Sequence, residues 1–102
     1  MKWLETCSPG DRKRVEIISK ALGEFPDMVI WLFKKDCPEM IDGSEKILYE
    51  AGVFSSGQQI LIRFACDVWF GESKCNVFDL TRRLDGKNFV NVMEAMAMWR
   101  RL

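Results

Sequence analysis

One segment, SSGQQILIRFACDVWFG at residues 55–71, constrains the fold more than any other part of the sequence. Two serines open it, and each has a glutamine three positions later, which is the spacing of a capping box at a helix N-terminus. Gly71 stands where a left-handed residue commonly ends a helix. The segment therefore predicts a helix over residues 56–70.

This predicted helix is apolar on most of its circumference. Arg63 and Asp67, four residues apart, supply nearly all of its charge. A helix of this kind must be covered on several sides by other elements. A chain of 102 residues is long enough for one domain. We therefore expect an all-α fold in which residues 1–102 form a single compact bundle of five or six short helices around this central one.

Caps and breakers mark the other predicted helices. Their expected starts are Ser8, Pro26, Asp42 or Ser44, Asn76 or Asp79, and Asp85. Gly23 and Gly52 should end two of these helices in left-handed caps, with Val53 packed back onto Leu48. Residues 28–33 are six consecutive apolar residues, which fit a buried strand or a buried helix. We favour helix, because no convincing second strand is present to pair with this segment.

The last predicted helix begins after Asp85 and runs to the arginines near residue 101. Its expected inward face consists of Phe89, Val92, Met93, Met96 and Trp99. Met98 should project from the opposite side, among polar residues. An exposed apolar side chain in that position indicates a contact surface.

The stretch WFGESKCNVFDL, residues 69–80, carries several reactive side chains between two predicted helices. An EF-hand loop with Val77 at its apolar eighth position would put Phe70 and Lys74 at ligand positions, so calcium binding is not expected. The sequence contains no histidine, and its four cysteines lack close pairing. We therefore predict no metal, no cofactor and no catalytic residue, and read residues 69–80 as a hinge between helices.

Cys37 is the thiol with the most reactive sequence context. In KKDCP it could stand at a helix N-cap beside two lysines, and such surroundings lower a thiol pKa. Asp36 adjoins it, however, and no histidine can serve as its base. The glycines form no phosphate-binding or nucleophile-elbow motif either. The sequence thus favours a protein that is not an enzyme.

Charge and hydropathy restrict the environment of the chain. Fifteen basic residues balance fifteen acidic ones, so no overall field draws the protein to phosphate backbones or anionic lipid. No apolar run approaches the length of a membrane span or a signal peptide. The spacing of the cysteines favours free thiols, and we therefore expect a cytoplasmic protein without a membrane contact.

The functional hypothesis follows from these exclusions and from the surplus of large apolar side chains. We expect a protein-binding module, a small regulator or inhibitor of a larger partner, with a homodimer as a further arrangement. The expected partner-binding residues are Trp3, Met98, Arg100, Arg101 and Leu102.

The alternative hypothesis is a DNA-binding regulator of the helix-turn-helix type. Three short helices cover residues 58–101, and the sequence TRRLDGKN joins the last two. The candidate nucleic-acid contacts are Arg82, Arg83, Lys87, Asn88 and Asn91.

Overall fold

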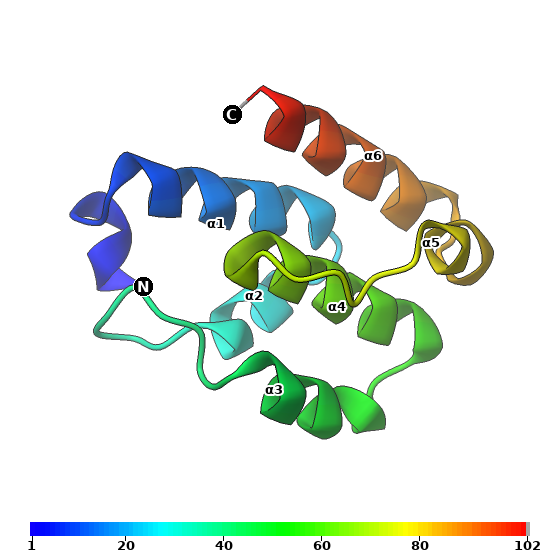
Figure 1. Cartoon of the computed structure of the whole chain (residues 1–102), viewed down its shortest axis with the longest axis horizontal. Coiled ribbons are helices and arrows are strands. Elements are labelled where there is room, and N and C mark those ends of the chain that lie inside the picture. Colours follow the sequence, from blue (N-terminus) through cyan, green and yellow to red (C-terminus); the bar gives the residue numbers. More distant parts are fainter. Residues whose placement is uncertain (102) are drawn as a thin grey trace.

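Six α-helices and two short 3₁₀ helices follow one another along residues 1–101, the part of the chain that this computed structural model describes. The elements are η1 (Lys2–Glu5), α1 (Pro9–Ala21), α2 (Pro26–Leu32), α3 (Ser44–Glu50), η2 (Ala51–Val53), α4 (Ser56–Phe70), α5 (Val77–Arg83) and α6 (Gly86–Arg100). They form a compact all-α bundle with α4 near its middle (Figure 1). The predicted fold class is confirmed.

Local capping explains most helix starts. The Asp11 N–H donates to Ser8 Oγ over 3.1 Å at the start of α1. At the start of α4, Ser55 and Gln58 form one of the two predicted capping boxes, with hydrogen bonds of 3.2 and 3.1 Å. The side chain of Gln59 instead donates to the Gly52 and Phe54 carbonyls. Asn76 caps α5 and Asp85 caps α6 in the same way. These side chains satisfy backbone N–H groups that have no partner within the helix.

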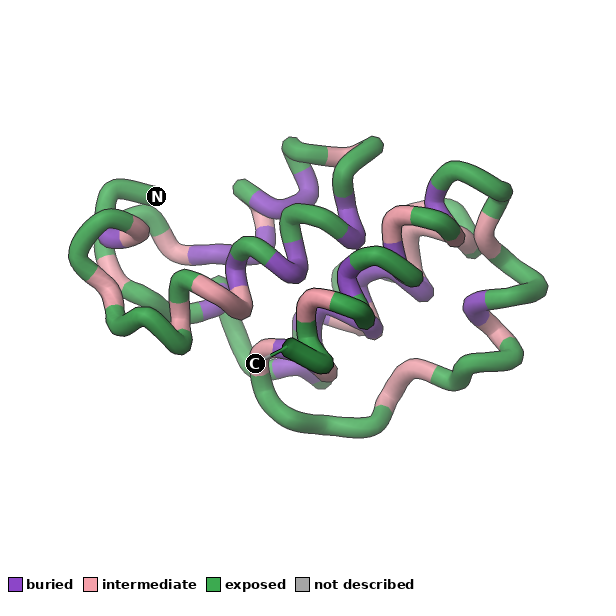
Figure 2. The backbone as a smooth tube through the Cα atoms, turned by 90° about the horizontal axis from the view of Figure 1, so that it is seen from above, coloured by how far each residue is buried: buried purple, intermediate pink, exposed green. Residues whose placement is uncertain are grey.

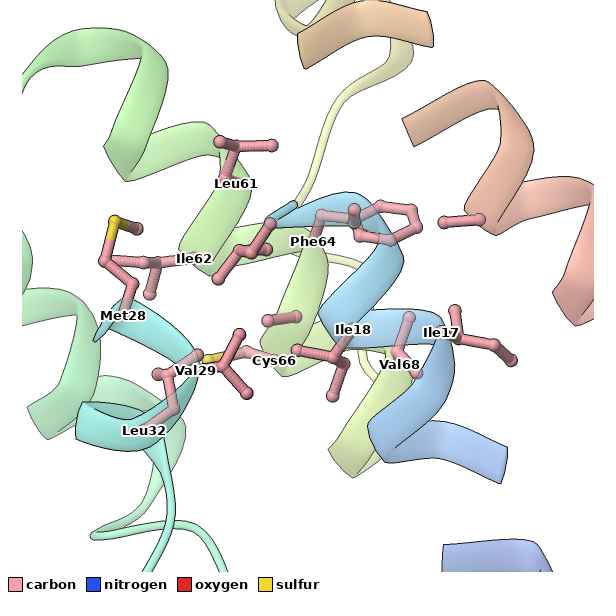
Figure 3. Close-up of a cluster of buried hydrophobic side chains, with 14 of the residues drawn as sticks. Ile17, Ile18, Met28, Val29, Leu32, Leu61, Ile62, Phe64, Cys66 and Val68 are labelled. Atoms are coloured by element: carbon pink, nitrogen blue, oxygen red, sulfur yellow. The ribbon is translucent and has the colours of Figure 1, made fainter. Parts of the chain in front are cut away.

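Helix α4 packs against neighbouring helices on several sides and contributes many of the core residues. Its buried residues are Ile60, Leu61, Ile62, Phe64, Ala65, Cys66 and Val68. On one side, Ile62 and Cys66 meet Val29 and Leu32 of α2, whereas Phe64 points away from α2 toward α6 (Figure 3). The prediction that residues 56–70 form the central helix is therefore confirmed.

Residues 28–33 are helical up to Leu32, as predicted. Phe33 then adopts extended backbone and forms an isolated antiparallel bridge with Met40. Between these two residues the chain consists of bends, so no helix begins after Cys37. The proposed N-cap position of Cys37 is wrong, because the 34–39 segment instead folds back and Lys34 N–H donates to the Glu39 carbonyl.

Helix α6 is rotated by roughly a quarter of a turn from the predicted orientation. Its buried residues are Asn88, Val92 and Ala95, and they face α1, its main neighbour. Met98, expected on the outside, is half-buried and packs against the core. Met93 and Trp99, expected inside, are 53% and 45% exposed. Small side chains at the contact let two helix backbones approach closely, which favours this orientation over one with bulky residues inside.

Trp3 is buried, and the expectation that it lies on the surface is wrong. It is 6% exposed, and its indole N–H donates to the Lys34 carbonyl over 2.8 Å. Its ring lies 5.8 Å from Phe33 and 6.5 Å from Trp69, centroid to centroid. The guanidinium of Arg14 covers the Trp69 ring at 4.7 Å. This aromatic cluster closes the N-terminal end of the bundle.

The sequence predicts left-handed caps at Gly23, Gly52 and Gly71, and the first two of these predictions are wrong. Gly71 has φ +70° and ends α4 as expected, but within residues 1–101 no other residue has positive φ. The chain leaves α1 through Leu22 and Gly23 in a turn, and it leaves α3 through η2. Val53 is 87% exposed and does not pack on Leu48 as predicted. The 3₁₀ turn takes the place of the cap there.

Candidate docking groove

A groove of about 390 Å³ lies between the second half of α4, the 71–76 connection, the start of α5 and the C-terminal half of α6. The connection is visible in Figure 2 as an arc that leaves the helices and returns at α5. In Figure 1 the connection passes in front of α4 and reaches α5 beside the start of α6. The groove is lined by Phe64, Asp67, Val68, Gly71, Glu72, Cys75, Val77, Leu80, Met96 and Trp99.

Asp67 holds one wall of the groove in place. Its Oδ1 accepts a hydrogen bond of 2.7 Å from the Lys74 N–H, and its Oδ2 accepts one of 2.8 Å from the Cys75 N–H. Both are charge-assisted, which makes them stronger than bonds between neutral groups. The connection between α4 and α5 is thus attached to the side of α4. The sequence indicated only a hinge here and did not reveal this attachment.

The walls of the groove are mainly apolar, and several of them remain exposed. Phe64, Val68 and Leu80 are largely buried in the floor. Four exposed side chains of α5 and α6 make up what we call the C-terminal apolar face: Val77, Met93, Met96 and Trp99. Met96 and Trp99 line the groove directly, and Met93 lies one turn before Met96 on α6. Concave, apolar sites of this size are typical of ligand-binding and partner-binding surfaces.

The charges on the groove are acidic. Among the described residues that line it, Asp67, Glu72 and Cys75 are the ionisable ones, and none is basic. Each oxygen of the Asp67 carboxylate accepts a hydrogen bond from a backbone N–H group. Glu72 stands at the rim, and the Lys74 ammonium is 4.0 Å from its carboxylate. The site would therefore favour an apolar ligand that also carries a positive charge.

The thiols near the groove are poor nucleophiles. Burial raises the pKa of Cys75 from its ordinary 9.0 to about 11, and the neighbouring Asp67 and Asp79 carboxylates add to this rise. Burial likewise raises the pKa of Cys66 to about 12. A reactive cysteine needs the opposite shift, since the thiolate is the attacking form.

The predicted partner-binding residues fall in different places. Trp3 lies inside the aromatic cluster, and Met98 lies half-buried beside the core. Arg100 and Arg101 are exposed at the end of α6, directly after Trp99. Leu102 lies outside the described residues. Of the four predicted residues that the structure describes, the two arginines are therefore accessible and adjoin Trp99, which lines the groove.

The predicted nucleic-acid residues do not form one basic surface. Asn88 is 8% exposed, and its side-chain amide donates to Asp85, so it is not available as a base reader. Asn91 is half-buried near Gly23. Arg82 pairs with Asp79, and Lys87 pairs with Glu24 over 3.0 Å. Of the three basic residues in this set, Arg83 alone is in no ion pair that the structure gives among residues 1–101.

Sequence reasoning missed the groove, although one signal pointed to it. The last helix carries apolar residues on two sides, a small set at Val92 and Ala95 and a bulky set at Met93, Met96 and Trp99. A terminal helix that packs mainly on one neighbour can bury only one of them. The second set therefore had to face solvent or a partner.

Three further observations concern the described residues as a whole. Within residues 1–101, no three histidine, cysteine, aspartate or glutamate side chains lie close enough to hold a metal ion. None of the helices there has both the length and the apolar composition needed to cross a bilayer. Comparison with protein-family models, curated proteins and solved structures found no match.

Proposed function

We propose that this protein is a non-enzymatic protein-binding module that docks an amphipathic helix of another protein in the groove beside α6. The observation that carries the proposal is the C-terminal apolar face around an apolar groove of about 390 Å³. Aromatic and methionine side chains are enriched at the centres of protein interfaces. Docking of a helix into an apolar groove is a common way to recognise a peptide segment.

The charges on the groove restrict the chemistry of the partner. Asp67 and Glu72 line it, and none of its lining residues in the described part of the chain is basic. A partner helix should therefore present bulky apolar residues at three- and four-residue spacing, with Lys or Arg beside them. A helix with Glu or Asp in those positions would meet like charge and lose affinity.

A module of this kind would act as a regulator or inhibitor by covering the partner's helix. The proposal includes a cytoplasmic location, which is supported by the four unpaired cysteines. It includes no cofactor and no catalytic step, which accords with the raised pKa values of Cys66 and Cys75.

Two synthetic amphipathic peptides test the proposal. Both carry the same leucine and tryptophan face, and one has lysine where the other has glutamate. In an NMR titration, the lysine peptide should shift the signals of Val77, Met96 and Trp99, and the glutamate peptide should shift them much less. Trp99→Ala should weaken binding by about tenfold or more, as loss of a central aromatic anchor does.

Tyr49→Ala is the matched control, because Tyr49 is an exposed aromatic side chain on α3. It should leave the affinity for the lysine peptide unchanged. The proposal is wrong if neither peptide binds, or if the shifted signals centre on another face and Trp99→Ala has no effect.

DNA binding remains the second hypothesis, and the arrangement of its candidate residues does not favour it. Of the five expected contacts, Asn88 is buried, and Arg82 and Lys87 are in ion pairs. Salt-dependent retention on duplex DNA, lost on Arg82→Ala and Arg83→Ala, would restore it.

A further inference from the structure

We infer that two copies of this chain cover each other's groove, and that this pairing holds the docking site closed until a partner displaces it. The inference rests on the proposed function, because it concerns the same face. In the pair, Trp99 of each copy packs at the mouth of the other copy's groove. Arg100 of each copy lies against the other's acidic rim.

The chain itself has an apolar residue followed by positive charges, the combination that its groove favours. The groove is lined by Asp67 and Glu72, and these two acids favour a bulky apolar residue with a positive charge beside it. Trp99 is 45% exposed and is followed at once by two exposed arginines, Arg100 and Arg101. Within residues 1–101, neither arginine is in an ion pair with an acid of the same chain. Both therefore remain free to pair with acids of a second copy.

Symmetry lets one surface supply both halves of the contact. In a two-fold dimer, if a residue of the first copy touches a given residue of the second, the reverse contact exists as well. Here the donor end, Trp99 with Arg100, adjoins the acceptor groove, because Trp99 also lines it. Two copies can thus exchange two Trp99 contacts and two Arg100–Glu72 pairs. Tryptophan, methionine and arginine are the residue types enriched at such interfaces.

The pairing also accounts for the exposure of the C-terminal apolar face. Its four side chains are each 40 to 55% exposed, and they lie on two different elements, α5 and α6. Scattered exposed apolar residues are ordinary, but contact between water and a cluster of them around a groove is unfavourable. Burial of this cluster against a second copy would stabilise the pair.

Sedimentation equilibrium over a wide range of protein concentration tests the inference. The wild-type chain should show a reversible monomer–dimer equilibrium. Trp99→Ala should raise the dimer Kd by about tenfold or more. Glu72→Arg and Arg100→Glu should each raise it as well, because each places like charges together in both contacts. Combining the two substitutions should restore the dimer, since the charges are then exchanged.

Ile30→Ala is the matched control, because Ile30 is an exposed apolar residue on α2, away from the groove. It should leave the Kd unchanged. Far-UV circular dichroism of each variant separates loss of pairing from loss of fold. The inference is overturned if the wild-type chain stays monomeric at every concentration. It is also overturned if Trp99→Ala dimerises normally or if the charge exchange fails to restore pairing.

Adding the lysine peptide separates this inference from the proposed function. Displacement of the dimer into one-to-one complexes supports both. A monomeric protein that binds the peptide retains the proposed function and removes the inference. A dimer that passes the charge-exchange test but binds no peptide retains the pairing of the two copies and removes the proposed function, and with it the displacement by a partner.

Discussion

The two tryptophans nearest the ends of the chain, Trp3 and Trp99, have opposite environments. Trp3 is 6% exposed, with its indole N–H bonded to the Lys34 carbonyl. Trp99 is 45% exposed and lies beside a groove. What separates them is coverage: Trp3 packs on Phe33 and Trp69, whereas the outer face of α6 has no comparable cover within residues 1–101. The contrast shows that an aromatic residue near a chain end indicates binding only when its surroundings leave it open.

The polar groups of the two regions also serve different ends. At the N-terminal end, Arg14 stacks on the Trp69 ring and donates to the Trp69 carbonyl over 2.9 Å, so charge closes the cluster. At the groove, the Asp67 carboxylate attaches the 71–76 connection to α4, so a charged group keeps one wall in place. The C-terminal half of α4 therefore contributes both to the closed aromatic cluster, through Trp69, and to the open groove, through Asp67.

The largest expected difference between the two regions is in stability. Trp3→Ala should lower the free energy of unfolding by about 3 to 5 kcal/mol, because it leaves a cavity among aromatic rings. Trp99→Ala should lower it by less than about 1 kcal/mol, as for an exposed position. Urea denaturation at low protein concentration measures both without a contribution from self-association. Equal losses in the two variants would contradict the comparison.

Asp67→Ala should have the next largest effect. It removes the acceptor of two backbone N–H groups, which costs about 1 to 3 kcal/mol. Hydrogen exchange at the Lys74 and Cys75 amides should accelerate, while exchange in the aromatic cluster should not. Asp36→Ala, at an exposed acid in the 34–40 segment, is the control and should change neither. Unchanged protection at Lys74 and Cys75 would show that Asp67 does not hold the groove wall.

Gly71 lines the groove and Gly52 lies in η2, and substitutions at these two glycines test the backbone conformation. Gly71→Ala should destabilise the protein by about 1 kcal/mol, because φ +70° strains a residue with a Cβ atom. Gly52→Ala should be neutral or slightly stabilising, since its φ is not positive and an added Cβ would meet no atom within 4 Å. Thermal unfolding of the two variants distinguishes them. A larger loss for Gly52→Ala would contradict the backbone geometry at both sites.

The smallest effect at neutral pH concerns the thiols. Cys66 and Cys75 should react slowly with iodoacetamide, because their raised pKa values keep them protonated. Their contribution to stability is complete below pH 9.0, where folded and unfolded chains both carry the neutral thiol. It is lost as pH rises toward the folded values of about 11 and 12, since the unfolded chain ionises first. Mass spectrometry of labelled peptides measures the rates, and rapid labelling of Cys75 at neutral pH would contradict its burial.

Most of what could be predicted from the sequence was local. The caps at Ser8, Ser55 and Asp85 depend on residues three positions apart, and all three are present. The central position of α4 follows from its own composition. These features depend on residues close together in the sequence, so they can be predicted without knowledge of the tertiary contacts.

The errors arose where distant partners decide the outcome. Trp3 is buried because it packs on Phe33 and Trp69, and the Lys34 carbonyl, 31 residues away, accepts its indole N–H. The rotation of α6 is set by its packing on α1, where Val92 and Ala95 fit better than the bulky residues favoured by periodicity alone. At Gly23 and Gly52, a glycine allows the left-handed conformation but does not require it.

The groove has two walls with separate supports. The 71–76 connection is attached to α4 through Asp67, whereas α6 rests mainly on α1 through Val92 and Ala95. A bulky side chain that enters could act as a wedge and tilt α6 while every backbone hydrogen bond of α4 stays intact. Such a tilt would change the width of the groove and weaken only the packing of α6 on α1. The same core could then accommodate side chains of different sizes.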